Sequence, residues 1–136
     1  MFDAFLVPDK TTVTEKGDSA PLDVSAASNP IFLATLSITD VVEQESIEIS
    51  LFPSADGATW DAKAAATFPQ KFYVGEYPLL VDLSAAAGSK FLRAHWEVNR
   101  WGRGPTAAKF EFGLRIREVS PEALQEAQAE AQTRRA

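Results

Sequence analysis

Residues 47–60, IEISLFPSADGATW, join a strictly alternating apolar pattern to an Asp-Gly turn and a tryptophan. Alternate residues of an extended chain lie on opposite faces, which places Ile47, Ile49 and Leu51 on one side and Ser46, Glu48 and Ser50 on the other. Asp56-Gly57 can supply the positive backbone angles of a tight reversal, after which Trp60 can lie back on the sheet. The segment therefore predicts a half-buried antiparallel strand, a turn and an aromatic anchor.

The composition suits a single globular domain. Of 136 residues, 46% are apolar and 24% charged, so the chain can bury a core of useful size. The absence of cysteine excludes disulfides and thiolate metal sites. A net charge of -6 argues against nucleic acid as a partner, and no apolar run approaches the roughly 20 residues of a membrane-spanning helix. No basic region precedes the first apolar patch, so we expect no signal peptide.

Short apolar alternations separated by turn residues recur as far as residue 119. The three clearest are Phe32, Ala34, Leu36 and Ile38; Leu92, Ala94, Trp96 and Val98; and Phe110, Phe112, Leu114 and Ile116. We expect further strands at residues 2–7, ending at Pro8, at 21–24 and at 79–83. The threonines of the polar stretch 11–21 suit either an edge strand or an extended arm, and residues 61–67 fit either a strand or a helical turn. Seven or eight strands without intervening helices predict an all-β fold, an antiparallel β-sandwich of jelly-roll type.

The pattern divides the chain into three parts. Residues 1–20 form an N-terminal strand and an extended arm, residues 21–119 the β-sandwich, and residues 120–136 a C-terminal helical tail. Ser120 can cap this helix and Pro121 suits its first position. Because the apolar stripe of the helix is narrow, the tail is either a solvated end or a segment that docks on a neighbouring subunit.

No residue set amounts to an active site. His95 is the only histidine, and Glu97 is the only carboxylate spaced to share its face. We therefore expect no catalytic residues, no metal site and no cofactor. His95 is then a surface or interface residue on the polar face of a strand, and the protein is not an enzyme.

The candidate partner-binding residues lie in one loop and on two strands. Trp101 lies between Arg100 and Arg103 in a glycine-containing loop, which is typical of an interface anchor or a sugar-stacking platform, although packing onto its own loop is an alternative. If the two strands are neighbours, their outward residues form a mixed-charge patch that is either solvated surface or a subunit contact. These residues are Arg93, His95, Glu97, Lys109, Glu111, Arg115 and Arg117.

Two resemblances extend this interpretation. The runs S-A-D-G-A-T-W (54–60), F-L-R-A-H-W (91–96) and F-E-F-G-L-R-I (110–116) resemble the galactose-binding-like jelly roll of discoidin-type domains, without the paired cysteines of that family. A second resemblance covers nearly the whole body. The order of its motifs is similar to that in small capsid decoration or cement proteins of tailed bacteriophages: D-A-F-L-V, T-x-T, S-A-P-L-D-V, the long apolar strand, the same hairpin and F-L-R-A-H-W-E-V.

Each resemblance implies a different function. The second implies a virion structural protein, made in the host cytoplasm, which forms a homo-oligomer and contacts other capsid-shell proteins through its arms, outer face and Trp101 loop. The first implies a carbohydrate-binding module that uses Trp101, Trp60 and nearby polar residues. Neither reading involves a nucleic acid or a membrane as partner.

Overall fold

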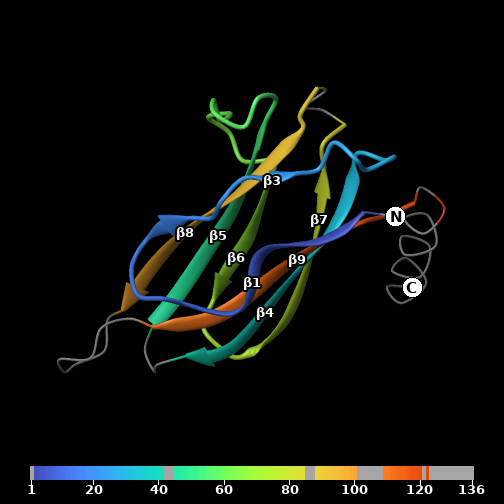
Figure 1. Cartoon of the computed structure of the whole chain (residues 1–136). Helices are drawn as coiled ribbons and strands as arrows, with labels where there is room; N and C mark the ends of the chain where they lie inside the picture. The colour runs from blue at the N-terminus through green and yellow to red at the C-terminus, as the bar shows by residue number, and fades with distance from the viewer. Residues whose placement is uncertain (1, 42–44, 85–87, 101–108, 121, 123–136) are drawn as a thin grey trace, which may run out of the picture.

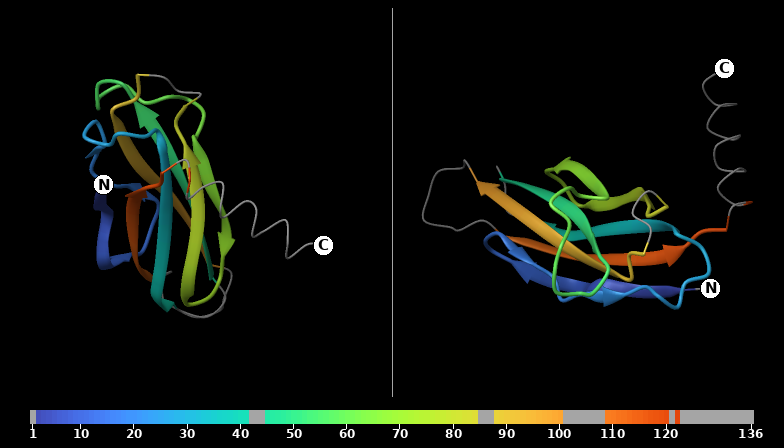
Figure 2. Two further views of the ribbon diagram at one scale, coloured as in Figure 1. Left: turned by 90° about the vertical axis from the view of Figure 1, so that its right-hand side faces the viewer. Right: turned by 90° about the horizontal axis from the view of Figure 1, so that it is seen from above.

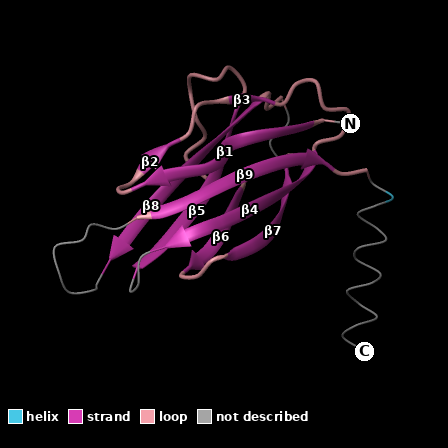
Figure 3. Cartoon of the chain, turned by 60° about the horizontal axis from the view of Figure 1, so that its bottom comes forward, coloured by secondary structure: helices cyan, strands magenta, loops and turns pink. Residues whose placement is uncertain are grey.

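The computed structural model describes residues 2–41, 45–84, 88–100, 109–120 and 122, in which all nine elements are strands (Figure 1). Sheet A contains, in spatial order, β1 (Asp3–Val13), β9 (Phe110–Glu118), β4 (Ile31–Val41) and β7 (Gly75–Asp82). Sheet B contains β2 (Gly17–Asp18), β8 (Phe91–Arg100), β5 (Glu45–Ser54) and β6 (Ala66–Lys71), with β3 (Leu22–Asp23) also paired to β8. The predicted all-β, antiparallel fold is confirmed, and Figure 3 shows the strands crossing the whole body.

The strand pairs are nested along the chain. β1 pairs with β9, β2 and β3 pair with β8, β4 pairs with β7, and β5 pairs with β6. The chain therefore follows one long hairpin, with its tip between β5 and β6, that is folded over into two layers. Two further pairings, β4 with β9 and β5 with β8, complete the sheets. In the left view of Figure 2, the strands of sheet A lie in front of sheet B.

The core lies between the two sheets, and the predicted apolar faces line it. From sheet A it receives Phe32, Ala34, Leu36, Ile38, Phe110, Phe112, Leu114 and Ile116, and from sheet B Ile47, Ile49, Leu51, Leu92, Ala94 and Trp96. β4 is a central strand, as its two partly covered faces predict. Ser46 is an exception, because this predicted outward residue is buried and accepts a 2.6 Å hydrogen bond from the side-chain amide of Gln70.

The first strand is longer than predicted. β1 does not end at Pro8 but continues to Val13 as an edge strand of sheet A, which is one of the two alternatives predicted for the threonine-rich stretch, the other being an extended arm. β2 then begins at Gly17 on the other sheet. Three residues of β1, from Pro8 to Lys10, bulge outward opposite Gly113. Proline is tolerated here because β1 is an edge strand and the bulge interrupts its pairing.

The Asp-Gly turn has the predicted backbone but does not make a tight hairpin. Gly57 has a φ of 77°, as a reversal requires, yet the next strand, β6, begins only at Ala66. The Asp56 carboxylate accepts hydrogen bonds from the backbone N–H groups of Ala58 (2.9 Å) and Thr59 (2.8 Å). These bonds, with one from the Ser54 hydroxyl, lower the pKa of Asp56 to about 2. The longer loop leaves room for Trp60 to reach the outer face of sheet B.

Candidate interaction surfaces

The predicted mixed-charge patch does not exist, because β8 and β9 belong to opposite sheets. β8 lies beside β5 in sheet B, whereas β9 lies between β1 and β4 in sheet A. The inward residues of both strands meet in the core, so their outward residues face away from each other. Arg93 and His95 are on the outer face of sheet B, and Arg115 and Arg117 are on the outer face of sheet A.

The loop that was predicted to hold an interface anchor is not among the residues that the structure describes. Trp101 and Arg103 lie outside the described residues, and Arg100 is the last residue of β8. The helical tail after Ser120 also lies outside them, apart from Glu122. A partner-binding role for these residues stays a prediction.

The outer face of sheet B carries a polar and aromatic cluster, the sheet-B cluster, made of Asp18, Trp60, Arg93, His95 and Glu97. The β2–β8 pairing sets Asp18 directly opposite His95. Asp18 Oδ1 lies 2.8 Å from His95 Nδ1 and 3.7 Å from Arg93 Nε, and His95 Nε2 lies 2.9 Å from Glu97 Oε1. The Arg93 guanidinium lies 4.6 Å from the centre of the Trp60 ring. Trp60 therefore packs back on the sheet, as predicted, through a cation–π contact.

The two carboxylates set the electrostatics of this cluster. The hydrogen bond with Glu97 raises the pKa of His95, and Asp18 raises it further, whereas partial burial opposes both. A protonated imidazole donates from both ring nitrogens and so satisfies both carboxylates at once. Within the described residues no three His, Asp or Glu side chains are grouped as metal ligands. The cluster is chemically suited to fastening β2 to β8.

The outer face of sheet A carries a two-point ion pair between β1 and β9. Arg115 Nε donates to Asp3 Oδ1 at 2.8 Å, and a second guanidinium nitrogen contacts Asp3 Oδ2. This pairing lowers the pKa of Asp3 and raises that of Arg115. Both side chains are solvent-exposed, so the pair aligns β1 on β9 but contributes little net stability.

Exposed apolar side chains are a feature that the sequence reasoning missed. Among the described residues, the large exposed hydrophobic side chains are Phe5, Phe72, Tyr73, Val74 and Leu80. Three of them are consecutive in the connection between β6 and β7, which we term the apolar turn: Phe72, Tyr73 and Val74, exposed by 38%, 74% and 56%. The sequence signal was the run of three large apolar residues directly before Gly75.

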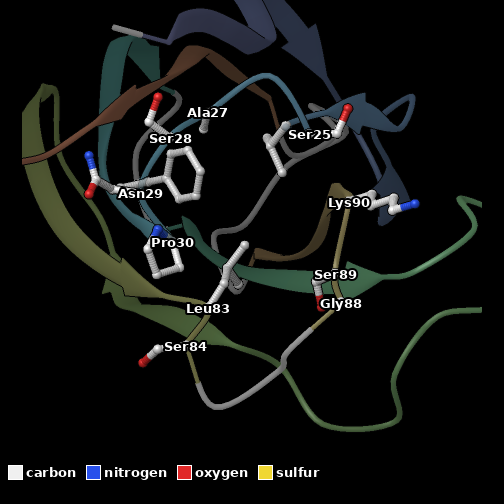
Figure 4. Close-up of a pocket in the computed structure, with 12 residues that line it drawn as sticks. Ser25, Ala27, Ser28, Asn29, Pro30, Leu83, Ser84, Gly88, Ser89 and Lys90 are labelled. Carbon is white, nitrogen blue, oxygen red and sulfur yellow. The ribbon is translucent and has the colours of Figure 1, made fainter.

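A pocket of about 530 Å³, the end pocket, opens at one end of the sandwich between the β3–β4 and β7–β8 connections (Figure 4). Buried Val24, Phe32 and Leu83 give it an apolar floor. Serine side chains and Lys90 surround it. No sequence pattern could predict this pocket, because its walls come from segments that are far apart in the chain.

Carboxylates hold the walls of the end pocket in place. Asp23 accepts from Ser25 N–H (2.8 Å), and Asp82 accepts from Ser84 N–H (2.9 Å). Buried Glu118 accepts from Ser28 N–H at 3.2 Å and from the Asn29 amide at 2.6 Å, as well as from Phe2 N–H. The bond from Phe2 N–H is the main cause of the lowered pKa of Glu118. Glu118 thus ties the β3–β4 connection to β9 and to Phe2.

The function of this protein has to be inferred from its structure. No protein-family model matches the chain, and no curated protein matches it. Over the part of the chain that the structure describes, no helix is long and apolar enough to cross a membrane.

Proposed function

We propose that this protein is a non-enzymatic structural component of a tailed-bacteriophage virion, of the capsid decoration or cement type. In this role it contacts further copies of itself and other shell proteins and thereby stabilises the assembled particle. A protein that binds only the assembled state shifts the equilibrium toward that state by mass action. No catalytic step is part of the proposal.

The nested strand pairing supports the finer fold class, a jelly roll. Folding one long hairpin into a four-stranded and a five-stranded layer generates the alternation between sheets seen along this chain. Jelly rolls of this kind serve in viral capsids and in lectins. The fold is therefore compatible with the two families that the sequence resembles, and the surface has to separate them.

The observation that carries the proposal is the distribution of exposed apolar side chains. Three of the five, Phe72, Tyr73 and Val74, are consecutive in the apolar turn, whereas Phe5 and Leu80 lie singly on the opposite edge strands of sheet A. In the sheet-B cluster, by contrast, His95 is hydrogen-bonded to both carboxylates, Asp18 and Glu97. Exposed apolar groups in one region mark a protein contact surface, because their burial is favourable and non-directional. The predicted roles of Trp101, Arg100 and Arg103 remain part of this proposal.

Particle association tests the proposal directly. Virions and capsids would be purified on density gradients from an induced culture of the source organism, and each fraction would be probed for this protein by mass spectrometry. We expect it to sediment with the particles and to stay bound through a second gradient. Recovery only from the soluble fractions, with particles that lack it, would contradict a virion role.

Glycan binding is the second candidate function, favoured by one observation on sheet B. Half-buried Trp60 and Phe52 flank Arg93 and His95, with the Phe52 and His95 ring centres 6.5 Å apart. Aromatic faces beside hydrogen-bonding groups suit sugars. Arg93, however, already covers one face of the Trp60 ring.

Affinity electrophoresis in polysaccharide gels separates the two candidates. A monomer retarded by polysaccharide, and released by Trp60→Ala but not by Phe5→Ala, would favour the carbohydrate module. Unretarded migration of the wild-type protein is expected if it is a shell component.

A further inference from the structure

We infer that Asp56–Gly57 is a latent site of isoaspartate formation, which the folded turn keeps unreactive and which reacts once that turn opens. The inference concerns a covalent change within the chain and does not depend on the proposed virion role. It follows from the groups that the turn places around the two reacting atoms, Asp56 Cγ and the Gly57 nitrogen.

The reaction needs only the chain and water. The Gly57 nitrogen, after losing its proton to solvent base, attacks Asp56 Cγ, and a C–N bond forms as one carboxyl oxygen leaves as water. The product is a five-membered succinimide ring, which a water molecule reopens. Cleavage of the bond from nitrogen to Cγ restores aspartate. Cleavage of the bond from nitrogen to the α-carbonyl carbon gives isoaspartate, in which the main chain runs through the side chain.

Glycine favours this reaction, and the fold requires a glycine here. Asp56 is the one aspartate of the chain that precedes a glycine, whose nitrogen has no neighbouring side chain to shield it. Gly57 has a φ of 77°, and a β-carbon there would lie 3.3 Å from the Phe91 ring. A side chain at position 57 would therefore strain the turn, so the fold retains the reactive dipeptide.

Solvent can reach the site. Asp56 is exposed, and the connection between β5 and β6 stands at one end of the sandwich (Figure 1). Base and water, which the reaction takes from outside the protein, are therefore present. Any protection has to come from the hydrogen bonds of the turn.

The turn holds the Asp56 carboxyl group in its unreactive form. Asp56 Oδ1 accepts hydrogen bonds from the N–H groups of Ala58 (2.9 Å) and Thr59 (2.8 Å), and the Ser54 hydroxyl lies 3.0 Å away. These bonds stabilise the carboxylate and lower the pKa of Asp56 to about 2. The neutral acid is the form that closes the ring, because the departing oxygen leaves as water. At any pH above this pKa, the folded turn thus contains fewer reactive carboxyl groups than the unfolded chain.

The turn also restrains the attacking nitrogen. Gly57 N–H donates to Ser54 Oγ at 2.9 Å, and Asp56 N–H donates to the same oxygen at 3.3 Å. Ser54 is buried, and its hydroxyl lies 2.6 Å from the carbonyl oxygen of Thr59. Loss of the Gly57 proton, the first step of ring closure, would break the bond to Ser54. Ser54 therefore restrains both reacting groups.

Ageing of the full chain tests the inference. The protein would be held for weeks at about pH 6, where an unfolded aspartate is mostly ionised. Isoaspartate would be measured by methyl transfer from S-adenosylmethionine with protein isoaspartate methyltransferase, and located by peptide mapping. We expect isoaspartate to form at Asp56 at least about tenfold more slowly in the folded wild type than in the same chain unfolded in guanidinium chloride, since each unit of pKa changes the neutral fraction tenfold.

Three variants separate the causes, once circular dichroism has shown that each is folded. Ser54→Ala should raise the rate in the folded protein at least about threefold, because it removes a partner of both reacting groups. Ser50→Ala is the matched control and should leave the rate unchanged, since the Ser50 hydroxyl contacts Thr67 (3.1 Å) on the outer face of sheet B. Asp56→Glu should abolish the signal from this peptide, because its longer side chain cannot form the five-membered ring.

Other outcomes overturn the inference. Equal rates in the folded and unfolded wild type would show that the turn gives no protection, and isoaspartate confined to other aspartates of the unfolded chain would refute the site. An unchanged rate in folded Ser54→Ala would refute the role of Ser54. If this variant does not fold, the comparison of the wild type in buffer and in guanidinium chloride still decides.

Discussion

Trp96 links the two sheets at the scale of a single residue. Its ring meets Phe112 of the opposite sheet edge to face, with centres 5.7 Å apart, and its indole N–H donates to the carbonyl of Glu15 at 3.1 Å. Gly17 passes over the indole so closely that a β-carbon there would lie 3.2 Å from Nε1. One side chain thus supports sheet A, β2 and the loop before β2.

Replacing this residue gives the first prediction. Trp96→Ala should destabilise the protein by about 3 to 5 kcal/mol, because a buried aromatic ring is lost and a cavity remains. Chemical denaturation monitored by far-UV circular dichroism would measure the change. Trp60→Ala is the matched control and should cost clearly less, since Trp60 is only half-buried on the outer face. Equal losses would show that Trp96 is not a core residue.

His95 gives a second residue-scale prediction, which concerns pH. Its pKa in the folded protein is raised by Glu97 and Asp18 above the unfolded value of about 6.5. The stabilisation is therefore fully present below about pH 6.5 and is lost as the pH rises through the folded pKa. The melting temperature should therefore fall between pH 6.5 and 8.5.

His95→Gln is the variant that isolates this effect. Because His95 is the only histidine, the variant should show a flatter pH profile than the wild type. Melting by differential scanning calorimetry at four pH values would compare the two. An identical slope in both proteins would assign the titration to another group.

At the scale of elements, the bulge of β1 and the glycine of β9 depend on each other. Val7 pairs with Leu114 and Thr11 with Phe112, so the intervening residues of β1 cross Gly113 alone. Lys10 takes a φ of 60° within this bulge. Bulges bend an edge strand and disrupt its ladder, which protects the edge from pairing with other chains.

Gly113→Ala tests this dependence. A β-carbon at this position would lie 2.8 Å from Asp9 Cα, which is backbone and cannot rotate away. We expect a loss of about 1 to 3 kcal/mol, the usual cost of overpacking. Urea denaturation would measure it, with Ala4→Gly in the same pair of strands as a control for simple side-chain change. A neutral result would show that β1 can move off β9 without cost.

For the strands, the sequence predicted which residues face the core but not which strands lie side by side. The faces of the strands around Ile49, Leu36, Ala94 and Leu114 were predicted correctly, because alternation is a local property of an extended chain. The pairing of β8 with β5, and of β9 with β1 and β4, was not, since it depends on contacts between distant segments. The error over the mixed-charge patch followed directly from this.

At the scale of the whole molecule, the last strand of the sandwich, β9, ends at Glu118, before the C-terminal tail begins. Val119 N–H donates to the carbonyl of Ile31 at 2.9 Å and so joins the segment after β9 to sheet A. Truncation after Ser120 should therefore leave the melting temperature within a few degrees of the full chain. Thermal melting of both proteins would check this.

A large drop in melting temperature on truncation after Ser120 would instead show that the tail packs on the sandwich. Truncation before Glu118 is the positive control. Loss of its bonds to Phe2, Ser28 and Asn29 should release the walls of the end pocket and lower the melting temperature clearly.

The sequence alone determined the fold class, the inward and outward faces of the main strands and the reversal at Gly57. Each of these follows from local periodicity or from the backbone freedom of one residue. Only the tertiary structure decided which strands share a sheet, where β1 bulges, which partners His95 finds and where the end pocket opens. These features depend on side-chain packing between segments far apart in the chain. The physical reason is that alternation orients side chains within a strand, whereas burial of the whole core selects the neighbours of that strand.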